Sequence, residues 1–299
     1  MIKVCILMST YNGEKHIGEQ LESILTQSVK DIMLFIRDDG STDNTIKILN
    51  EFSKKNPAKI KFYQGDNIGP SKSFLELVKR APKASYYMLA DQDDIWLENK
   101  VFIAIKSLDR FKSPALYYSN VTPVNNQLVA LEKNDLFLKK ETNLQKLVIR
   151  NEIIGCTVCF NQLLMDNLKQ IKSPTNTIMH DHWIGLINAV VKGTFIFDKE
   201  SYILYRQHEF NVVGSHRNPL TLLKKHFSKH NRSVRSNLIK LINESRLEIP
   251  LANIALIDDI CNYTTNFKSK MNLLFNKSLY QDSLLKNILW FIDVLINRY

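Results

Sequence analysis

The sequence lacks the glycine-rich loops with which many enzymes hold phosphate groups. Its nine glycines form neither the G-x-G-x-x-G pattern of nicotinamide-dependent enzymes nor the G-x-x-x-x-G-K-[ST] pattern of P-loop ATPases. Both of these classes are therefore disfavoured.

Cysteines and long apolar runs are also scarce. Four cysteines in 299 residues, with no secretion signal, indicate free thiols in a reducing compartment. The apolar run at 1–8 is too short for a signal peptide, and the run at 288–292 is far shorter than the roughly 20 residues that span a bilayer. We expect a cytoplasmic chain without a transmembrane helix.

Cys156 and Cys159 have the C-x-x-C spacing of a metal site, but no second pair accompanies them. Residues 155–160 instead predict a strand, on which positions three apart face opposite sides. We therefore disfavour metal binding by this pair.

Positive charge is concentrated in one part of the chain. The net charge is +10, yet residues 217–240, the basic segment, hold seven Lys/Arg and no Asp/Glu, which leaves 33 basic against 30 acidic residues elsewhere. Its apolar residues fall partly at helical spacing. The basic segment is either an amphipathic helix that contacts anionic lipid or another polyanion, or the solvated face of an ordinary surface helix.

The first ninety residues alternate between strand and helix patterns. Strands are predicted at 3–9, 33–40, 60–65 and 86–90, and helices at 14–27, 42–55 and 71–80, the second of them capped by Ser41 or Thr42. This alternation is typical of βαβ units, and 44% hydrophobic residues suffice to fill a core. The pattern predicts an α/β fold with a mostly parallel sheet.

Polar clusters follow the first, second and fourth of these strands, at 9–14, 38–43 and 91–94. Ligands of open parallel sheets bind beyond the carboxyl ends of the strands. We therefore expect the three clusters to converge on one crevice.

The last cluster places three carboxylates in four residues: Asp91, Asp93 and Asp94. Like charges so close repel one another unless a cation lies between them. Carboxylates in a D-x-D arrangement suit Mg²⁺ or Mn²⁺, which also bind the oxygens of a diphosphate. We predict a metal-bound nucleotide diphosphate here, the alternative being a solvated turn. Asp94 either belongs to this site or only caps the following helix.

Seven segments, in order, resemble the family 2 glycosyltransferases, which have the GT-A fold. They are "MSTYNGEKHIGEQLESILTQS", "RDDGSTDNT", "DNIGPSKSF", "ADQDDIW", "GCTVCFN", "HDHW" and "YRQH", and they cover roughly Lys3 to Val213. Within the family, the sequence is most similar to bacterial rhamnosyltransferases and related enzymes of cell-wall polysaccharide, capsule and lipopolysaccharide assembly.

The resemblance implies roles for the first two clusters. The loop after the first strand holds the nucleoside through a group of four residues: Thr10, Tyr11, Asn12 and Glu14. Asp39 binds the base, because a carboxylate accepts the N3 hydrogen of uracil or thymine and finds no such donor on cytosine. Asp38 either plays that part or caps the turn.

The resemblance also implies a donor site and a catalytic base. Asp91 faces the ribose or the sugar, Asp93 binds the metal, and His208 of "YRQH" lies on the metal or the diphosphate. Asp181 of "MHDHWIGL" takes the proton from the acceptor hydroxyl, unless it only caps the next helix.

The residues beside Asp181 also have purely structural interpretations. A zinc site at His180 and His182 lacks a convincing third ligand. Trp183 either stacks on a sugar ring or packs in the core.

The chain departs from the family at two points. Processive members carry a Q-x-x-R-W motif and transmembrane helices, and this chain has neither, which implies the addition of a single sugar. Relatives often read Gly-Asn-Asn after the histidine, whereas this chain reads Glu209-Phe210-Asn211, so the identity of the donor sugar stays open.

We expect a catalytic domain at 1–218, with a nucleotide-sugar half at about 1–112 and an acceptor half at about 113–218. Residues 219–299 form a helical region, with helices predicted at 220–244, 251–267 and 278–297. The last helix carries a broad apolar stripe that packs on the catalytic domain, on a second subunit in a homodimer, or on a lipid interface.

These features together predict a metal-dependent, inverting glycosyltransferase that uses Mn²⁺ or Mg²⁺ and lies on the inner face of the cell membrane. It would move rhamnose from dTDP-rhamnose, or a hexose from a UDP-sugar, onto a saccharide or lipid-linked acceptor, with no nucleic acid as partner. A sugar nucleotidyltransferase would need a glycine-rich basic loop after the first strand. A non-catalytic scaffold would be expected to lack at least one of the site acids, and all are present.

Overall fold

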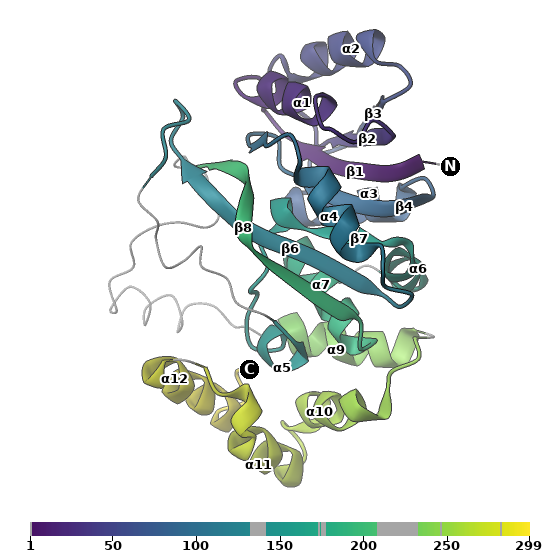
Figure 1. The fold of residues 1–299 in the computed structure, drawn as a ribbon. Helices are drawn as coiled ribbons and strands as arrows, with labels where there is room; N and C mark the ends of the chain where they lie inside the picture. Colours follow the sequence, from purple (N-terminus) through teal and green to yellow (C-terminus); the bar gives the residue numbers. More distant parts are fainter. Residues whose placement is uncertain are drawn as a thin grey trace.

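The first four strands form a parallel sheet that alternates with helices (Figure 1). The structure is a computed structural model, and it describes residues 2–131, 142–172, 174, 178–207, 233–245, 247–281 and 283–299. The elements are β1 (Ile2–Thr10), α1 (Ile17–Leu25), β2 (Ile32–Asp38), α2 (Thr45–Lys55), β3 (Ile60–Gln64), α3 (Pro70–Arg80) and β4 (Ala84–Ala90). Since β1 lies between β2 and β4, the strand order reverses beside β1, and ligands of such sheets bind beyond the carboxyl ends of the strands at this point.

The second half of the chain extends the same sheet. Its elements are β5 (Ile95–Trp96), α4 (Lys100–Leu108), β6 (Ala115–Val124), α5 (Leu144–Leu147), the 3₁₀ turn η2 (Gly155–Thr157), β7 (Cys159–Asn161), α6 (Gln162–Gln170), α7 (His180–Val190) and β8 (Thr194–Arg206). The full order is β3-β2-β1-β4-β7-β6-β8-β5, with β7 antiparallel to β4 and β6, and β5 antiparallel to β8. The predicted α/β fold with a mostly parallel sheet is confirmed.

Two apolar cores cover the two faces of the sheet, because side chains alternate along each strand. On β1, Cys5 and Leu7 pack with α3, α6 and α7. The intervening residues Val4, Ile6 and Met8 pack with α1, α2 and α4. The two helical layers hold the carboxyl ends of the strands in fixed positions.

The C-terminal helices are α9 (Ser233–Glu244), α10 (Leu251–Asn262), α11 (Phe267–Phe275), the 3₁₀ turn η3 (Lys277–Leu279) and α12 (Leu284–Leu295). They join the core that contains α5 and α7 through buried residues such as Leu238, Ile257 and Trp290. Tyr299 donates a hydrogen bond from Oη to the carbonyl of Val148 at 2.5 Å. None of the described helices is long and apolar enough to cross a membrane.

Several boundary predictions are wrong. Helix α2 has Asn44, not Ser41 or Thr42, at its N-cap, because Asp43 accepts a hydrogen bond from the backbone N–H of Thr45. The helix predicted at 251–267 ends at Asn262, and α11 follows it.

The strand predicted at 155–160 begins only at Cys159, because a 3₁₀ turn precedes it. Asp94 does not cap a helix, since α4 begins at Lys100 with Asn99 as its N-cap.

Candidate active site

The loop after β1 is bound to the loop after β2 by side chains that the sequence assigned to the nucleoside. Asn12 has a φ of +48° and accepts a hydrogen bond on Oδ1 from the N–H of Thr42 at 2.8 Å. Glu14 accepts one from the N–H of Asn44 at 3.0 Å. The side chains of Asn12 and Glu14 therefore connect the two loops, and these oxygens are already bonded within the protein.

Tyr11 and Gln92 connect the same loop to the D-x-D loop. The N–H of Tyr11 donates to Oε1 of Gln92 at 2.9 Å, and Nε2 of Gln92 donates to the carbonyl of Tyr11 at 3.0 Å. A Cβ on Gly13 would lie 2.4 Å from Oε1 of Gln92, so only glycine permits this approach. The Tyr11 side chain is exposed and can contact a ligand.

Thr10 and Asp38 have structural partners. Thr10 donates from Oγ1 to Oδ2 of Asp38 at 3.0 Å. Oδ1 of Asp38 accepts from the N–H groups of Gly40 at 3.1 Å and Ser41 at 2.9 Å. Of the two roles open to Asp38, the structure shows the turn cap.

Asp39 is buried at the carboxyl end of β2 and is ion-paired with Arg37. Its Oδ1 accepts from the N–H of Ile68 at 3.0 Å, and its Oδ2 accepts from the N–H of Gly69 at 2.9 Å. A carboxylate oxygen accepts about two hydrogen bonds. Oδ1 already has two donors and Oδ2 has one, so Oδ2 retains one acceptor position.

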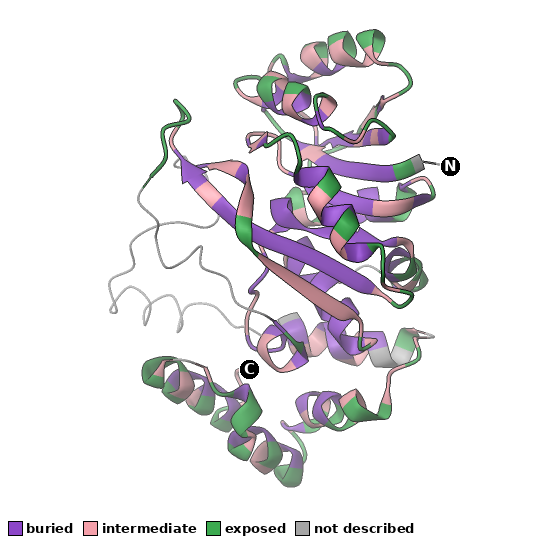
Figure 2. Cartoon of the chain, in the orientation of Figure 1, coloured by how far each residue is buried: buried purple, intermediate pink, exposed green. Residues whose placement is uncertain are grey.

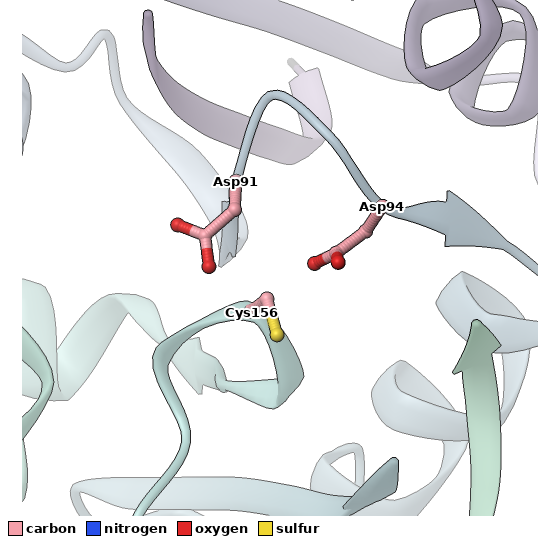
Figure 3. Close-up of side chains that lie close together, drawn as sticks. All are labelled: Asp91, Asp94 and Cys156. Carbon is pink, nitrogen blue, oxygen red and sulfur yellow. The ribbon is translucent and has the colours of Figure 1, made fainter. Parts of the chain in front are cut away.

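The three acids after β4 have different surroundings. Asp91 and Asp94 point toward Cys156 of η2, and a carboxylate oxygen of each and the thiol sulfur lie within 4.8 Å of one another (Figure 3). Burial, followed by the charges of Asp93 and Asp181, raises the pKa of Asp91 to about 7. Burial also raises the pKa of Asp94 and of the Cys156 thiol.

A buried lysine stands beside this acidic cluster. Lys100 donates from Nζ to the carbonyl of Cys156 at 2.9 Å and lies over the ring of Trp96, 4.7 Å from its centroid. Burial lowers the pKa of Lys100, while Asp94 and Asp91 act in the opposite direction. The ammonium group offsets part of the negative charge from within the protein.

Arg206, at the end of β8, holds the D-x-D loop from the other side. Its Nε donates to the carbonyl of Asp93 at 2.8 Å, and its backbone N–H donates to Oδ1 of Asp94 at 3.2 Å. The guanidinium also pairs with Glu19 of α1. The buried arginine therefore joins β8, α1 and the D-x-D loop.

Asp181 lies in the first turn of α7 and is 8% exposed. Its Oδ1 accepts from Nδ2 of Asn151 at 2.9 Å and from the N–H of His182 at 2.6 Å. Burial raises its pKa to about 6. Its Oδ2 lies beside Gly155 of η2, and the next residue, Cys156, has its thiol sulfur within 4.8 Å of a carboxylate oxygen of Asp91.

The two histidines and the tryptophan beside Asp181 are buried. His180 stacks on Phe74 with ring centroids 4.0 Å apart, and burial lowers its pKa to about 3, so its ring is neutral. His182 bonds through Nε2 to the carbonyl of Leu147 at 2.6 Å. Trp183 is 3% exposed and belongs to the core, which favours the packing interpretation.

Within the described part of the chain, Asp91, Asp94 and Cys156 are the only group of three metal-ligating side chains whose ligand atoms converge. His208 lies outside the described residues, as does most of the basic segment. The sequence interpretation missed Lys100, Arg206 and Asn151. Only Arg206 falls in a segment that carried the resemblance, two residues before the histidine in "YRQH".

Replacing Gly155 with alanine is expected to lower kcat by about 10-fold while donor affinity stays within a few-fold, because small misplacements of a catalytic group are costly. The new Cβ would lie 3.0 Å from Nε2 of His180 and 3.4 Å from Oδ2 of Asp181, both held in buried positions. Steady-state kinetics measures the effect. Gly18→Ala is the matched control, since a Cβ there meets nothing within 4 Å. An unchanged kcat in Gly155→Ala would show that this contact does not position Asp181.

Comparisons with known proteins identify the family of the chain. The family model described as glycosyl transferase family 2 matches residues 5–168. The dTDP-rhamnosyl transferase RfbG of Shigella flexneri is 31% identical over 248 residues, which cover 79% of this chain and 83% of that protein. An uncharacterised glycosyltransferase of Rickettsia typhi is 23% identical over 73% of the chain and 68% of that protein. The chain belongs to glycosyl transferase family 2.

Solved structures show the same fold. Residues 1–349 of S. aureus TarS in complex with UDP-GlcNAc match with a TM-score of 0.60 and 18% identity, over 98% of this chain and 81% of that chain. The mannosyltransferase PcManGT of Pyrobaculum calidifontis, in complex with GDP-Man and Mn²⁺, matches with a TM-score of 0.55 and 15% identity, over 99% of this chain and 81% of that chain. The predicted GT-A fold with C-terminal helices is confirmed, and the protein is a glycosyltransferase.

Proposed function

We propose that this protein is a metal-dependent, inverting rhamnosyltransferase. It would transfer rhamnose from dTDP-rhamnose to a hydroxyl of a saccharide or lipid-linked acceptor during assembly of a bacterial surface polysaccharide. The observation that carries the proposal is that η2 joins Asp181 to the acids that follow β4: Gly155 lies beside Oδ2 of Asp181, and Cys156 converges with Asp91 and Asp94. The similarity to a dTDP-rhamnosyl transferase supports the choice of donor.

The donor set of the crevice fits a hard divalent cation. Carboxylate oxygens are the ligands that Mg²⁺ and Mn²⁺ prefer, and a cation would relieve the repulsion that helps to raise the pKa of Asp91. Asp93, together with His208, would hold the ion, and Asp91 would face the ribose or the sugar. The bound ion would offset the charge that develops on the departing nucleotide diphosphate.

The remaining steps belong to the residues of the chain. Asp181 accepts the proton of the acceptor hydroxyl, and the oxygen then forms a bond to C1 of the sugar as the bond from C1 to the diphosphate breaks. Asn151 and the N–H of His182 orient the carboxylate through Oδ1. With no nucleophile of the enzyme between the two bonds, the configuration at C1 inverts.

The free acceptor position on Oδ2 of Asp39 supports a role in base selection. Thymine and uracil present an N3–H that this oxygen can accept, whereas cytosine has none. Arg37 and the N–H groups of Ile68 and Gly69 fix the carboxylate for that contact. The exposed ring of Tyr11 lies in the adjoining loop and would contact the nucleoside.

Hydrolysis of a panel of nucleotide sugars tests the proposal. We expect dTDP-rhamnose to be hydrolysed at least 10-fold faster than UDP-glucose, UDP-GlcNAc or GDP-mannose, with activity lost in EDTA and restored by Mn²⁺ or Mg²⁺. Product analysis on an accepted saccharide should show inversion at C1. A preference for a UDP-hexose would move the donor assignment, and full activity in EDTA would exclude the metal-dependent mechanism.

A further inference from the structure

The outward face of α12 is apolar along its whole length. Leu284 is 78% exposed, and the positions that follow at helical spacing are also exposed apolar side chains: Ile288, Phe291 and Leu295. The buried residues of the helix, such as Leu289 and Val294, lie on its other face. A soluble helix ordinarily turns polar residues outward, so this face needs a partner.

Further large apolar side chains are exposed on the neighbouring elements. Phe267 and Phe275 of α11 are 76% and 71% exposed, and Tyr280 follows η3 at the surface. Lys270 of α11 donates from Nζ to the carbonyl of Leu295 at 3.2 Å, which joins α11 to the end of α12. Exposed residues run along the outer sides of both helices in Figure 2. We call these exposed apolar residues of 267–296 the α11–α12 face.

Basic residues outnumber acidic ones in the segment that carries the α11–α12 face. Residues 267–299 hold four lysines and one arginine against two aspartates, a net charge of +3. The lysines are Lys268 and Lys270 of α11, Lys277 of η3 and Lys286 of α12. Of the acids, Asp293 is buried and Asp282 lies outside the described residues, while Asp259 of α10 accepts a hydrogen bond from Nδ2 of Asn272 on α11 at 3.1 Å. The segment therefore has a net positive charge.

We propose that the α11–α12 face docks on an anionic lipid bilayer. Leucine, isoleucine and phenylalanine would enter the boundary between headgroups and acyl chains, while the lysines reach lipid phosphates with their flexible side chains. A second copy of the chain fits less well. A two-fold axis would bring two segments of net positive charge together.

The described part of the basic segment, residues 233–240, makes one set of contacts inside the protein through Arg235. Its Arg235 donates to the carbonyls of Ile260 and Cys261 and stacks on Tyr263, so it caps α10 inside the protein. The lysines of α11 and α12 supply the described positive charge of the face. The proposed docking surface therefore consists of the exposed apolar residues and the lysines of 267–296.

Docking would place the catalytic acid near its acceptor. The C-terminal helices share a core with α5 and α7, and α7 carries Asp181 in its first turn. A bilayer bound at α11 and α12 would therefore lie on the side of the protein that is joined to α7. This link to a lipid-linked acceptor rests on the proposed function, whereas membrane binding does not.

Co-sedimentation of the full chain with vesicles tests the proposal. We expect binding to phosphatidylglycerol vesicles that is at least 10-fold tighter than binding to phosphatidylcholine vesicles and is weakened by salt. Leu284→Glu with Ile288→Glu should abolish it. Lys268→Glu with Lys277→Glu and Lys286→Glu should weaken it by at least 10-fold, since each basic residue contributes about fivefold.

Matched controls use exposed residues of the same types elsewhere. Phe102→Glu with Leu163→Glu, and Lys54→Glu with Lys55→Glu and Lys61→Glu, should leave vesicle binding unchanged. All variants should keep the melting temperature and the hydrolysis of soluble donor. Equal binding to neutral vesicles, no vesicle binding, or a dimer in solution that Leu284→Glu dissociates would each overturn lipid docking. Loss of transferase activity in the parent chain, with binding intact, would overturn only the proposed function.

Discussion

Asp181→Asn is expected to lower kcat by about 10²-fold or more, while donor affinity stays within a few-fold. An amide nearly keeps the shape of the carboxylate but cannot take up the proton of the acceptor hydroxyl. Its Oδ1 can still accept from Asn151 and from the N–H of His182, so the loop should keep its position. Single-turnover kinetics with saturating donor separates the chemical step from binding.

The pH profile is the second readout for Asp181. Burial raises its pKa to about 6, and only the ionised form can act as the base, so kcat/KM should fall about tenfold per pH unit below pH 6. The stability of the protein changes with pH in the opposite direction. A carboxyl whose pKa is higher in the folded than in the unfolded protein makes the free energy of unfolding fall as pH rises through this range. Asp181→Asn should therefore melt no lower than the parent protein at pH 7.5.

Asp198→Asn serves as a matched control, because Oδ2 of Asp198 on β8 accepts a hydrogen bond from Oη of Tyr117 on β6 at 3.0 Å, and Asp198 has no part in the proposed mechanism. It should keep full turnover. Retained turnover in Asp181→Asn would move the base to another residue, and His182 would be the next candidate. His182 is held to the carbonyl of Leu147, so its substitution would then also have to lower kcat.

The sheet and its helices were predictable because their patterns are local. β1 alternates between two cores at a period of two, and the polar residues after β1, β2 and β4 mark where each strand ends. Boundaries failed where a side chain changed the local backbone. Asp43, and not the predicted Ser41 or Thr42, accepts the hydrogen bond from the first N–H group of α2. A 3₁₀ turn begins at Gly155, within a predicted strand.

The site acids were predictable for the same reason, since they follow strands of a sheet whose carboxyl ends share one edge. Lys100 and Arg206 were not, because their contacts depend on how the chain folds and not on a local pattern. Lys100 sits in the first turn of α4, where a lysine ordinarily faces solvent, and Arg206 lies more than 100 residues after the loop that it holds. The periodicity of the sequence does not predict contacts that form only when the sheet folds.

Asp94 is the opposite case: the sequence singled it out, but the fold gives it a different role. Its place among three acids suggested either a ligand or a cap, but the fold makes it a buried acceptor for the N–H of Arg206. Asp93 lies at the partly exposed position of the loop. The two neighbouring carboxylates therefore differ in what they can reach, and that difference can be measured.

Asp93→Asn is expected to weaken the apparent affinity for Mn²⁺ by more than 10-fold and to lower kcat by about 10²–10³-fold, because an amide is a poorer ligand for a hard cation and supplies no negative charge. Asp94→Asn should change both by less than 3-fold. Its Oδ1 can still accept from the N–H of Arg206, and a fully buried side chain does not reach a diphosphate in the crevice. Titration of Mn²⁺ by electron paramagnetic resonance, with and without dTDP, measures the affinities.

The contrast between these variants separates two positions for the cation. The D-x-D assignment places the ion at Asp93, whereas the converging oxygens and sulfur of Asp91, Asp94 and Cys156 offer a deeper position. If Asp94→Asn and Cys156→Ala lose Mn²⁺ affinity while Asp93→Asn keeps it, the ion binds in the deeper cluster. Unchanged melting temperatures would confirm that Asp93→Asn acts through the ion, since Arg206 holds this loop by the backbone carbonyl of Asp93, which the substitution leaves in place.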